Sequence, residues 1–119
     1  MSGKITPNYI AVRKGDSFTI RFQFKFGNEF VDISGSSLKM QVKNQSDKKT
    51  VLTKLGFIDD ALKGKAHIGL LPEDTQRLNC DNNYLVDIKI TFANGEVHTF
   101  YPQDVNKSAS FIISENITE

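Results

Sequence analysis

The sequence predicts an all-β protein folded as an antiparallel β-sandwich. Two long segments, residues 17–26 and 84–92, alternate apolar and polar side chains. This period of two is typical of a strand that buries one face, and a helix could not separate the two sets of side chains. Shorter alternating segments recur along the chain, with turn residues between them. We therefore expect about seven to eight strands arranged in two packed sheets.

The individual strands follow from the same alternation and from the turns between them. Gly15-Asp16 provides the turn before the first long segment, and Asn94-Gly95 is the strongest short signal for a hairpin. The expected strands cover residues 9–13, 17–26, 38–43, 51–55, 66–70, 84–92, 97–101 and 109–113. The inward face of the first long segment would carry Phe18, Ile20, Phe22, Phe24 and Phe26. We expect one common core that contains Phe18, Phe22, Phe24, Tyr84, Ile88 and Phe92.

One short crossover helix is expected near residues 72–78, where the alternation stops. Pro72 suits the first turn of a helix, and the acidic Glu73 and Asp74 interact favourably with its N-terminal end. The whole pattern is typical of an immunoglobulin-like sandwich, although the tryptophan and the cysteine pair of true immunoglobulin domains are absent. Residues 1–8 are polar and are expected to form a flexible N-terminal arm, ahead of a single β-sandwich domain over residues 9–119.

Composition narrows the classes of function. The chain has 119 residues, a formal net charge of +1 and a single cysteine, Cys80. The near-neutral charge argues against binding governed by attraction to nucleic acid or to an anionic membrane, so we expect neither partner. A single cysteine permits no internal disulfide, so we expect stability from packing and folding in a reducing cytoplasm. No apolar stretch of the sequence is long enough to cross a bilayer.

No grouping of residues in the sequence indicates catalysis or metal binding. His67 and His98 have no second histidine or cysteine at metal-ligand spacing, and both are interpreted as ordinary strand residues. The acidic pair Asp59-Asp60 lacks the alternating oxygen ligands and the glycine turn of a calcium loop. Cys80 has no histidine nearby in sequence to activate it. We therefore expect no catalytic residues, no metal and no cofactor in a protein that is not an enzyme.

Several segments, taken in order, resemble the small immunoglobulin-like modules of tailed-phage and prophage virion proteins, including the N-terminal domain of phage baseplate upper proteins. The segments that carry the resemblance are residues 15–16, 31–35, 38–43, 64–78, 83–88 and 94–99. The resemblance implies a non-enzymatic structural component of a phage virion: a tail, baseplate, neck or head-decoration protein. It implies assembly with other virion proteins, a homo-oligomer, and a virion location after assembly in the bacterial host cytoplasm.

Two further hypotheses concern binding. The alternative function is a carbohydrate-binding β-sandwich module used in host-surface attachment, which the missing tryptophan and calcium loop make less favourable. The candidate assembly edge consists of Tyr9, Ile10, Ala11 and Val12, because a terminal apolar strand behind a flexible arm can add to a neighbour's open sheet edge. Exposed aromatics such as Tyr9 and Tyr101 could mark a binding face, but a sandwich edge explains them more simply.

Overall fold

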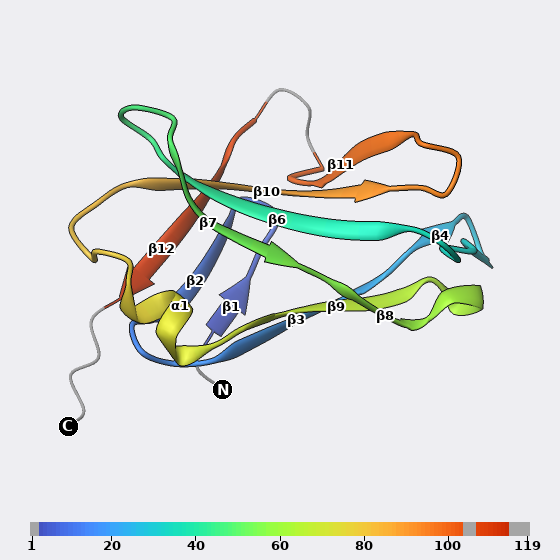
Figure 1. The fold of residues 1–119 in the computed structure, drawn as a ribbon, viewed down its shortest axis with the longest axis horizontal. Helices are drawn as coiled ribbons and strands as arrows, with labels where there is room; N and C mark the ends of the chain where they lie inside the picture. Colours follow the sequence, from blue (N-terminus) through green and yellow to red (C-terminus); the bar gives the residue numbers. More distant parts are fainter. Residues whose placement is uncertain (1–2, 104–106, 115–119) are drawn as a thin grey trace.

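The computed structural model describes residues 3–103 and 107–114, and most of their regular structure is strand. The strands are β1 (Gly3–Ile5), β2 (Tyr9–Arg13), β3 (Phe18–Gln23), β4 (Lys25–Phe26), β5 (Glu29–Phe30), β6 (Ser37–Asn44), β7 (Thr50–Leu55), β8 (Phe57–Asp60), β9 (Lys65–Leu70), β10 (Tyr84–Thr91), β11 (Val97–Tyr101) and β12 (Ala109–Ser114). The described residues also contain a short 3-10 helix, η1 (Ala61–Lys63), and an α-helix, α1 (Pro72–Gln76). α1 lies where the sequence predicts a crossover helix and joins β9 to β10 (Figure 1).

Two sheets form the layers of the sandwich (Figure 1). The larger sheet has seven strands in the order β1-β2-β12-β10-β6-β7, with β11 also paired to β10. The smaller sheet has the order β3-β9-β8. β4 and β5 form a separate two-stranded hairpin at the end of the molecule away from α1. α1 therefore carries the chain from the smaller sheet to the larger one, as the sequence predicts.

Strand order and one corner place the sandwich in the immunoglobulin-like class. The order β12-β10-β6-β7 matches strands G, F, C and C′ of a variable-type domain, and β3-β9-β8 matches strands B, E and D. β10 begins at Tyr84, whose hydroxyl accepts a hydrogen bond from the backbone N–H of Asn79 at 2.9 Å. A tyrosine bonded in this way at the start of strand F is the tyrosine corner of these sandwiches. The predicted fold class is confirmed.

The pairing of the strands differs from the prediction in two respects. β2 and β12 run parallel, with Ile10 opposite Phe111, so the sandwich is not antiparallel throughout. The segment predicted as one strand over residues 17–26 is divided into β3 and β4, because its partner β9 begins only at Lys65. The preceding residue, Gly64, has φ of +67° and accepts a hydrogen bond from the Phe24 N–H at 2.9 Å, which closes the ladder. Such divisions and the short added strands give twelve strands over the described residues.

Residues 3–8, which the sequence analysis assigns to a flexible arm, lie against the sandwich in the structure. β1 pairs antiparallel with β2, with Gly3 opposite Val12. The Tyr101 hydroxyl donates a hydrogen bond to the Thr6 carbonyl at 2.8 Å. A Cβ atom at Gly3 would collide with the Phe18 ring, so the backbone packs directly against that ring. Main-chain pairing thus orders a segment whose side chains are mostly polar, while residues 1–2 lie outside the described part.

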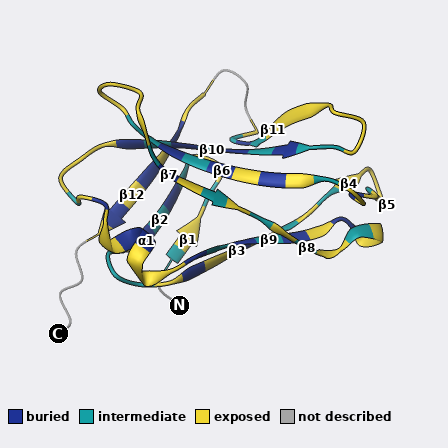
Figure 2. Cartoon of the chain, in the orientation of Figure 1, coloured by how far each residue is buried: buried dark blue, intermediate teal, exposed yellow. Residues whose placement is uncertain are grey.

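The core consists of two clusters instead of the one that the sequence predicts. The larger cluster includes Phe18, Tyr84 and Ile88 from the predicted set. The smaller one is built on Ile33, Leu38, Ala66 and Ile90, with Phe24 and Phe92 packed against it. Phe22 and Phe100 contact both clusters. Burial decreases toward the β4–β5 hairpin, where Phe26 is 84% exposed although the alternation places it on the inward face (Figure 2).

Candidate functional site

Three large apolar side chains are exposed beside one another where β7, β8 and the start of α1 meet. Leu55 is 63% exposed, Phe57 65% and Leu71 49%. They border a shallow hollow of about 400 Å³, whose wall also includes Lys54 and His67. We call Leu55, Phe57 and Leu71 the Leu55–Phe57 surface. Clustered apolar exposure of this kind is typical of a protein contact surface, whereas a single exposed leucine is not.

Gly56 explains why two of these side chains face solvent. The chain passes at Gly56 from β7 in the larger sheet to β8 in the smaller sheet. A Cβ atom there would lie 2.9 Å from Leu38 Cβ and 3.0 Å from Ile68 Cγ1, so only glycine fits without a shift of its neighbours. The Gly56 N–H donates to the Leu38 carbonyl at 2.9 Å. Because side chains alternate along the extended chain, the inward position of Gly56 directs Leu55 and Phe57 outward.

A histidine and a carboxylate lie next to the apolar side chains. His67 Nδ1 is 2.8 Å from Asp59 Oδ1 and 2.9 Å from Asp59 Oδ2. The His67 ring lies 5.6 Å from the Phe57 ring, with an angle of 32° between the two planes. His67 was interpreted as an ordinary strand residue, and its position on β9 opposite Phe57 is consistent with that role. The pair gives the rim of the hollow a polar side.

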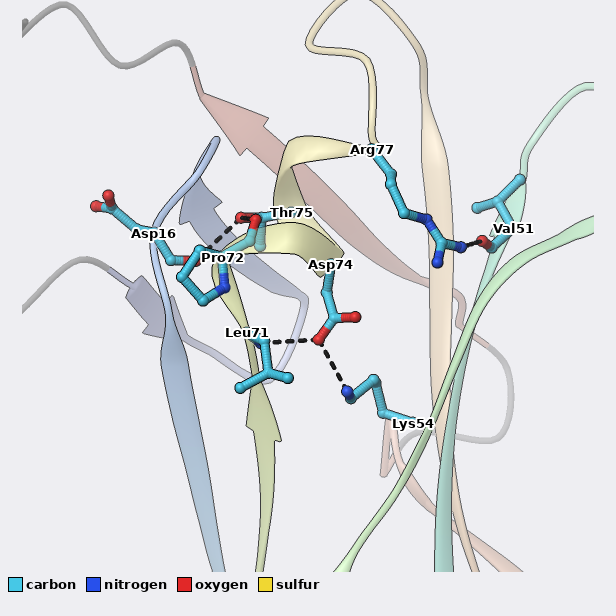
Figure 3. A network of polar contacts seen from close by, with 8 residues as sticks. All are labelled: Asp16, Val51, Lys54, Leu71, Pro72, Asp74, Thr75 and Arg77. Carbon is cyan, nitrogen blue, oxygen red and sulfur yellow. Dashed lines mark hydrogen bonds and ion pairs between the residues drawn. The ribbon is translucent and has the colours of Figure 1, made fainter.

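A buried carboxylate fixes the base of the Leu55–Phe57 surface (Figure 3). Asp74 Oδ2 accepts a hydrogen bond from the Leu71 N–H at 2.7 Å and forms an ion pair with Lys54 Nζ at 2.8 Å. Burial alone would raise the pKa of Asp74, but the hydrogen bonds from Lys54 and Leu71 and the positive charges of Lys54 and Arg77 outweigh it and hold that pKa below its ordinary value. One side chain therefore ties the start of α1 to β7.

Two more side chains, those of Thr75 and Arg77, hold α1 against the rest of the molecule (Figure 3). Thr75 is fully buried, and its hydroxyl donates to the Asp16 carbonyl at 3.0 Å and accepts from the Gly15 N–H at 2.9 Å. Arg77 donates to the Val51 carbonyl on β7 at 2.9 Å. These bonds satisfy polar groups that would otherwise be unpaired at a crossover. The polar network therefore has a structural role: it holds α1 against β7 and the β2–β3 turn.

Sheet edges flank the Leu55–Phe57 surface on both sides. Among the described residues, β7 pairs with β6 alone and β8 pairs with β9 alone. Each strand therefore has one edge whose backbone N–H and C=O groups face outward. Exposed edges are templates for pairing with another chain. Apolar side chains and free backbone groups thus occur together at this side of the sandwich.

The assembly edge predicted from the sequence is not a free edge. β2 pairs with β1 on one side and with β12 on the other, over described residues. Ile10 and Val12 are buried in the larger core cluster, and Tyr9 and Ala11 are half-buried. The edge strand is β1, because residues 3–5 fold back onto β2. Exchange of the arm between copies would require β1 to leave its own sheet, and it stays a prediction.

The other residues considered in the sequence analysis have the following positions in the structure. His98 is exposed on β11, with Nε2 3.8 Å from Glu96 Oε1. Cys80 is a half-buried free thiol that packs against the larger core cluster. Tyr101 is buried, which contradicts its interpretation as an exposed aromatic, and burial raises the pKa of its hydroxyl to about 12. Among the described residues, no group of three or more histidine, cysteine, aspartate or glutamate side chains could hold a metal ion.

The Leu55–Phe57 surface was not predicted from the sequence, because leucine is a residue type that is usually buried. The available signal was the order Leu55-Gly56-Phe57, in which two large apolar residues flank a glycine between strands. That order reveals a surface only when the path of the chain between the sheets is known.

Comparison with known proteins does not assign this chain to a family. No family model matches the chain, and no curated protein matches it. A solved structure of murine CRIg is similar over 95% of this chain and 97% of that chain, with 14% identity and a TM-score of 0.41. A similarity at this TM-score does not support a structural assignment. The immunoglobulin-like class therefore rests on the strand order and the tyrosine corner. Over the described residues, no helix is long and apolar enough to cross a membrane.

Proposed function

We propose that this chain is a non-enzymatic structural component of a phage virion that acts by protein–protein assembly through the Leu55–Phe57 surface. The observation that carries the assembly role is the adjacent exposure of Leu55, Phe57 and Leu71 between two open sheet edges. Burial of such side chains would stabilise a contact by about 25 cal/mol per Å² of apolar area removed from water. The virion context comes from the sequence resemblance alone.

A second copy of the chain is the expected partner. Two copies related by a twofold axis would present the same apolar side chains to each other, and β7 of each copy could extend the other's sheet. The polar network beneath the surface keeps α1 and β7 in fixed positions, so the contact needs no rearrangement of the free protein.

The experiment measures self-association by sedimentation equilibrium of the full chain and of two matched variants. Phe57→Glu places a charge in the Leu55–Phe57 surface, and Leu62→Glu places the same charge on η1, where Leu62 is 71% exposed. We expect an oligomer for the native chain and for Leu62→Glu, and a folded monomer for Phe57→Glu. A monomer for the native chain at every concentration, or equal masses for both variants, contradicts the proposed surface.

The virion context has its own test. Mass spectrometry of phage particles purified from the native bacterial host is expected to detect the chain in a fixed ratio to the other structural proteins. Its absence from purified particles would contradict the virion role and leave the result on self-association unaffected.

A further inference from the structure

A second hollow lies where the end of β1 is beside β3, away from the Leu55–Phe57 surface (Figure 1). Its volume is about 440 Å³, within the range of ligand sites. Residues 5–7 form one wall, and residues 21–25, at the end of β3 and the start of β4, form another. Because five consecutive residues of one extended segment line the hollow, it meets side chains from both faces of that segment and therefore its edge.

The edge of β3 that borders this hollow has no partner strand, since among the described strands β3 pairs with β9 alone. The Phe24 N–H donates to the carbonyl of Gly64, directly before β9, so the backbone groups of Phe24 and Phe22 face β9. Backbone groups alternate in direction along an antiparallel strand, and those of Arg21 and Gln23 therefore face the hollow. Open backbone groups at an edge are a template for pairing with another extended chain.

The floor of the hollow is aromatic. The Phe100 ring meets the Phe22 ring edge-on at 5.1 Å and the Phe24 ring at 4.8 Å, measured between ring centroids. All three rings line the hollow and are half-buried, so each keeps part of its surface in contact with water. Ile5, on the wall formed by β1, is 40% exposed. An apolar side chain placed over these rings would be removed from water together with them, which favours binding.

The charged residues that line the hollow are Arg21 and Lys25, both positive and both exposed. Neither forms a salt bridge with another described residue. Because they lie four residues apart in an extended segment, both side chains leave the same face of it, and carboxylates are the groups that complement them. Pairing with β3 of a second copy would instead bring these cations against the same charges. Like charges destabilise a strand pair, so this edge does not suit self-association.

We propose that the β3 edge binds an extended acidic segment of another protein, which adds to the smaller sheet as a further strand. The backbone of this segment pairs with Arg21 and Gln23, and its alternate apolar side chains cover the aromatic floor. The carboxylates between them meet Arg21 and Lys25, so main-chain pairing supplies affinity and the two cations select acidic sequences. No residue that lines this hollow belongs to the Leu55–Phe57 surface, so failure of either proposal leaves the other unaffected.

The test is an NMR titration of the ¹⁵N-labelled full chain with a blocked heptapeptide in which glutamate and valine alternate. The matched probe carries lysine in place of every glutamate. We expect the glutamate peptide to shift the backbone amides of Arg21, Gln23 and Phe100 and to bind about tenfold more tightly than the lysine peptide. Equal binding of the two peptides, or no shift with the glutamate peptide, overturns the proposal.

Two further peptides test whether the contact is a strand pair. Each is the glutamate peptide with N-methyl groups on alternate backbone amides, one on the glutamates and the other on the valines. Successive amides of a strand point to opposite sides, so one methylated set faces β3 and the other faces away from it. We expect one of the two peptides to bind about tenfold more weakly than the other. Equal affinities of both would mean that the peptide does not bind as a strand, and would overturn the proposal.

Charge reversal on the protein provides a matched control. Arg21→Glu should weaken binding of the glutamate peptide by about tenfold and strengthen binding of the lysine peptide. Lys39→Glu reverses an exposed charge on β6, outside the hollow, and should leave both affinities unchanged. Both side chains are exposed, so neither variant removes packing from the core. Native affinities for both peptides in Arg21→Glu would place the peptide on another surface and overturn the proposal.

Discussion

The two long alternating segments have nearly the same sequence pattern but differ in how far their inward side chains are buried. In β10 the inward side chains stay buried over the whole strand, with Tyr84 4% exposed and Ile90 1%. In the first segment the exposed fraction rises from 2% at Ile20 to 84% at Phe26. Both segments obey the alternation, so the pattern alone does not decide burial.

Neighbouring strands account for the difference. β10 pairs with β6 along all of its residues and with β12 and then β11 on its other side. β3 pairs only with β9 among the described strands, and β9 begins at Lys65. Beyond that point the chain turns into the β4–β5 hairpin, whose two strands consist of exposed residues. An alternating strand buries its apolar face only as far as an opposing layer covers it.

The largest effect is expected at the centre of β10. Ile88 is fully buried, and Ile88→Ala should lower the free energy of unfolding by about 4 kcal/mol, since a buried cavity adds to the loss of transfer energy. Urea unfolding measures it. Ile112→Ala is the matched control: this isoleucine on β12 is 42% exposed and should cost less than about 1 kcal/mol. Equal losses at both positions would show that coverage does not govern this sheet.

An intermediate effect is expected at Phe22, where the first segment begins to lose its cover. Its ring is half-buried and meets the Phe100 ring edge-on at 5.1 Å. Phe22→Ala should cost about 2 kcal/mol, less than the 3–5 kcal/mol typical of a fully buried phenylalanine. The same urea experiment applies. A loss above about 4 kcal/mol would mean that Phe22 is as well covered as Ile88, and a loss below about 1 kcal/mol would place it outside the core.

A smaller, pH-dependent effect is expected at Tyr101, which pairs with Ile88 of β10 and binds the docked arm. Tyr101→Phe should cost about 1 kcal/mol through one lost hydrogen bond. Burial raises the pKa of Tyr101 from 10.0 to about 12, so the neutral hydroxyl is favoured in the folded chain. Its contribution to stability is therefore complete below pH 10 and is lost as the pH rises toward 12.

Thermal midpoints measured across that pH range test this prediction. The native chain should lose more stability between pH 10 and pH 12 than Tyr101→Phe does. Tyr9→Phe is the control, because Tyr9 is half-buried and its hydroxyl has no hydrogen bond within the described structure. Parallel pH curves for the native chain and Tyr101→Phe would refute a role for the buried hydroxyl.

The smallest effect is expected at the uncovered end of the first segment. Phe26→Ser should change the free energy of unfolding by less than about 0.5 kcal/mol, because the ring is already in contact with water. A loss of more than about 1 kcal/mol in urea unfolding would mean that another layer covers the hairpin in solution.

Much of the fold could be predicted from local signals. The alternation of Tyr84, Val86, Ile88 and Ile90 gave both the strand and its buried face. Pro72 and the acidic residues after it placed the crossover helix correctly, although Asp74 also pairs with Lys54, which no spacing in the sequence indicates. The sequence also does not show that the candidate assembly edge at Tyr9–Val12 is paired on both sides, since whether a strand is at the edge depends on which segments pair with it.

Local signals in the sequence predicted the period of the strands and the positions of the turns, because these depend on the geometry of neighbouring residues along one chain. The tertiary structure alone decided which alternating residues are covered, that residues 3–8 dock on β2, and that Leu55, Phe57 and Leu71 gather at one side. It also brought residues 5–7 beside β3 to form one hollow. Each of these features arises where segments distant in sequence meet or fail to meet, and the free energy of burial depends on that contact.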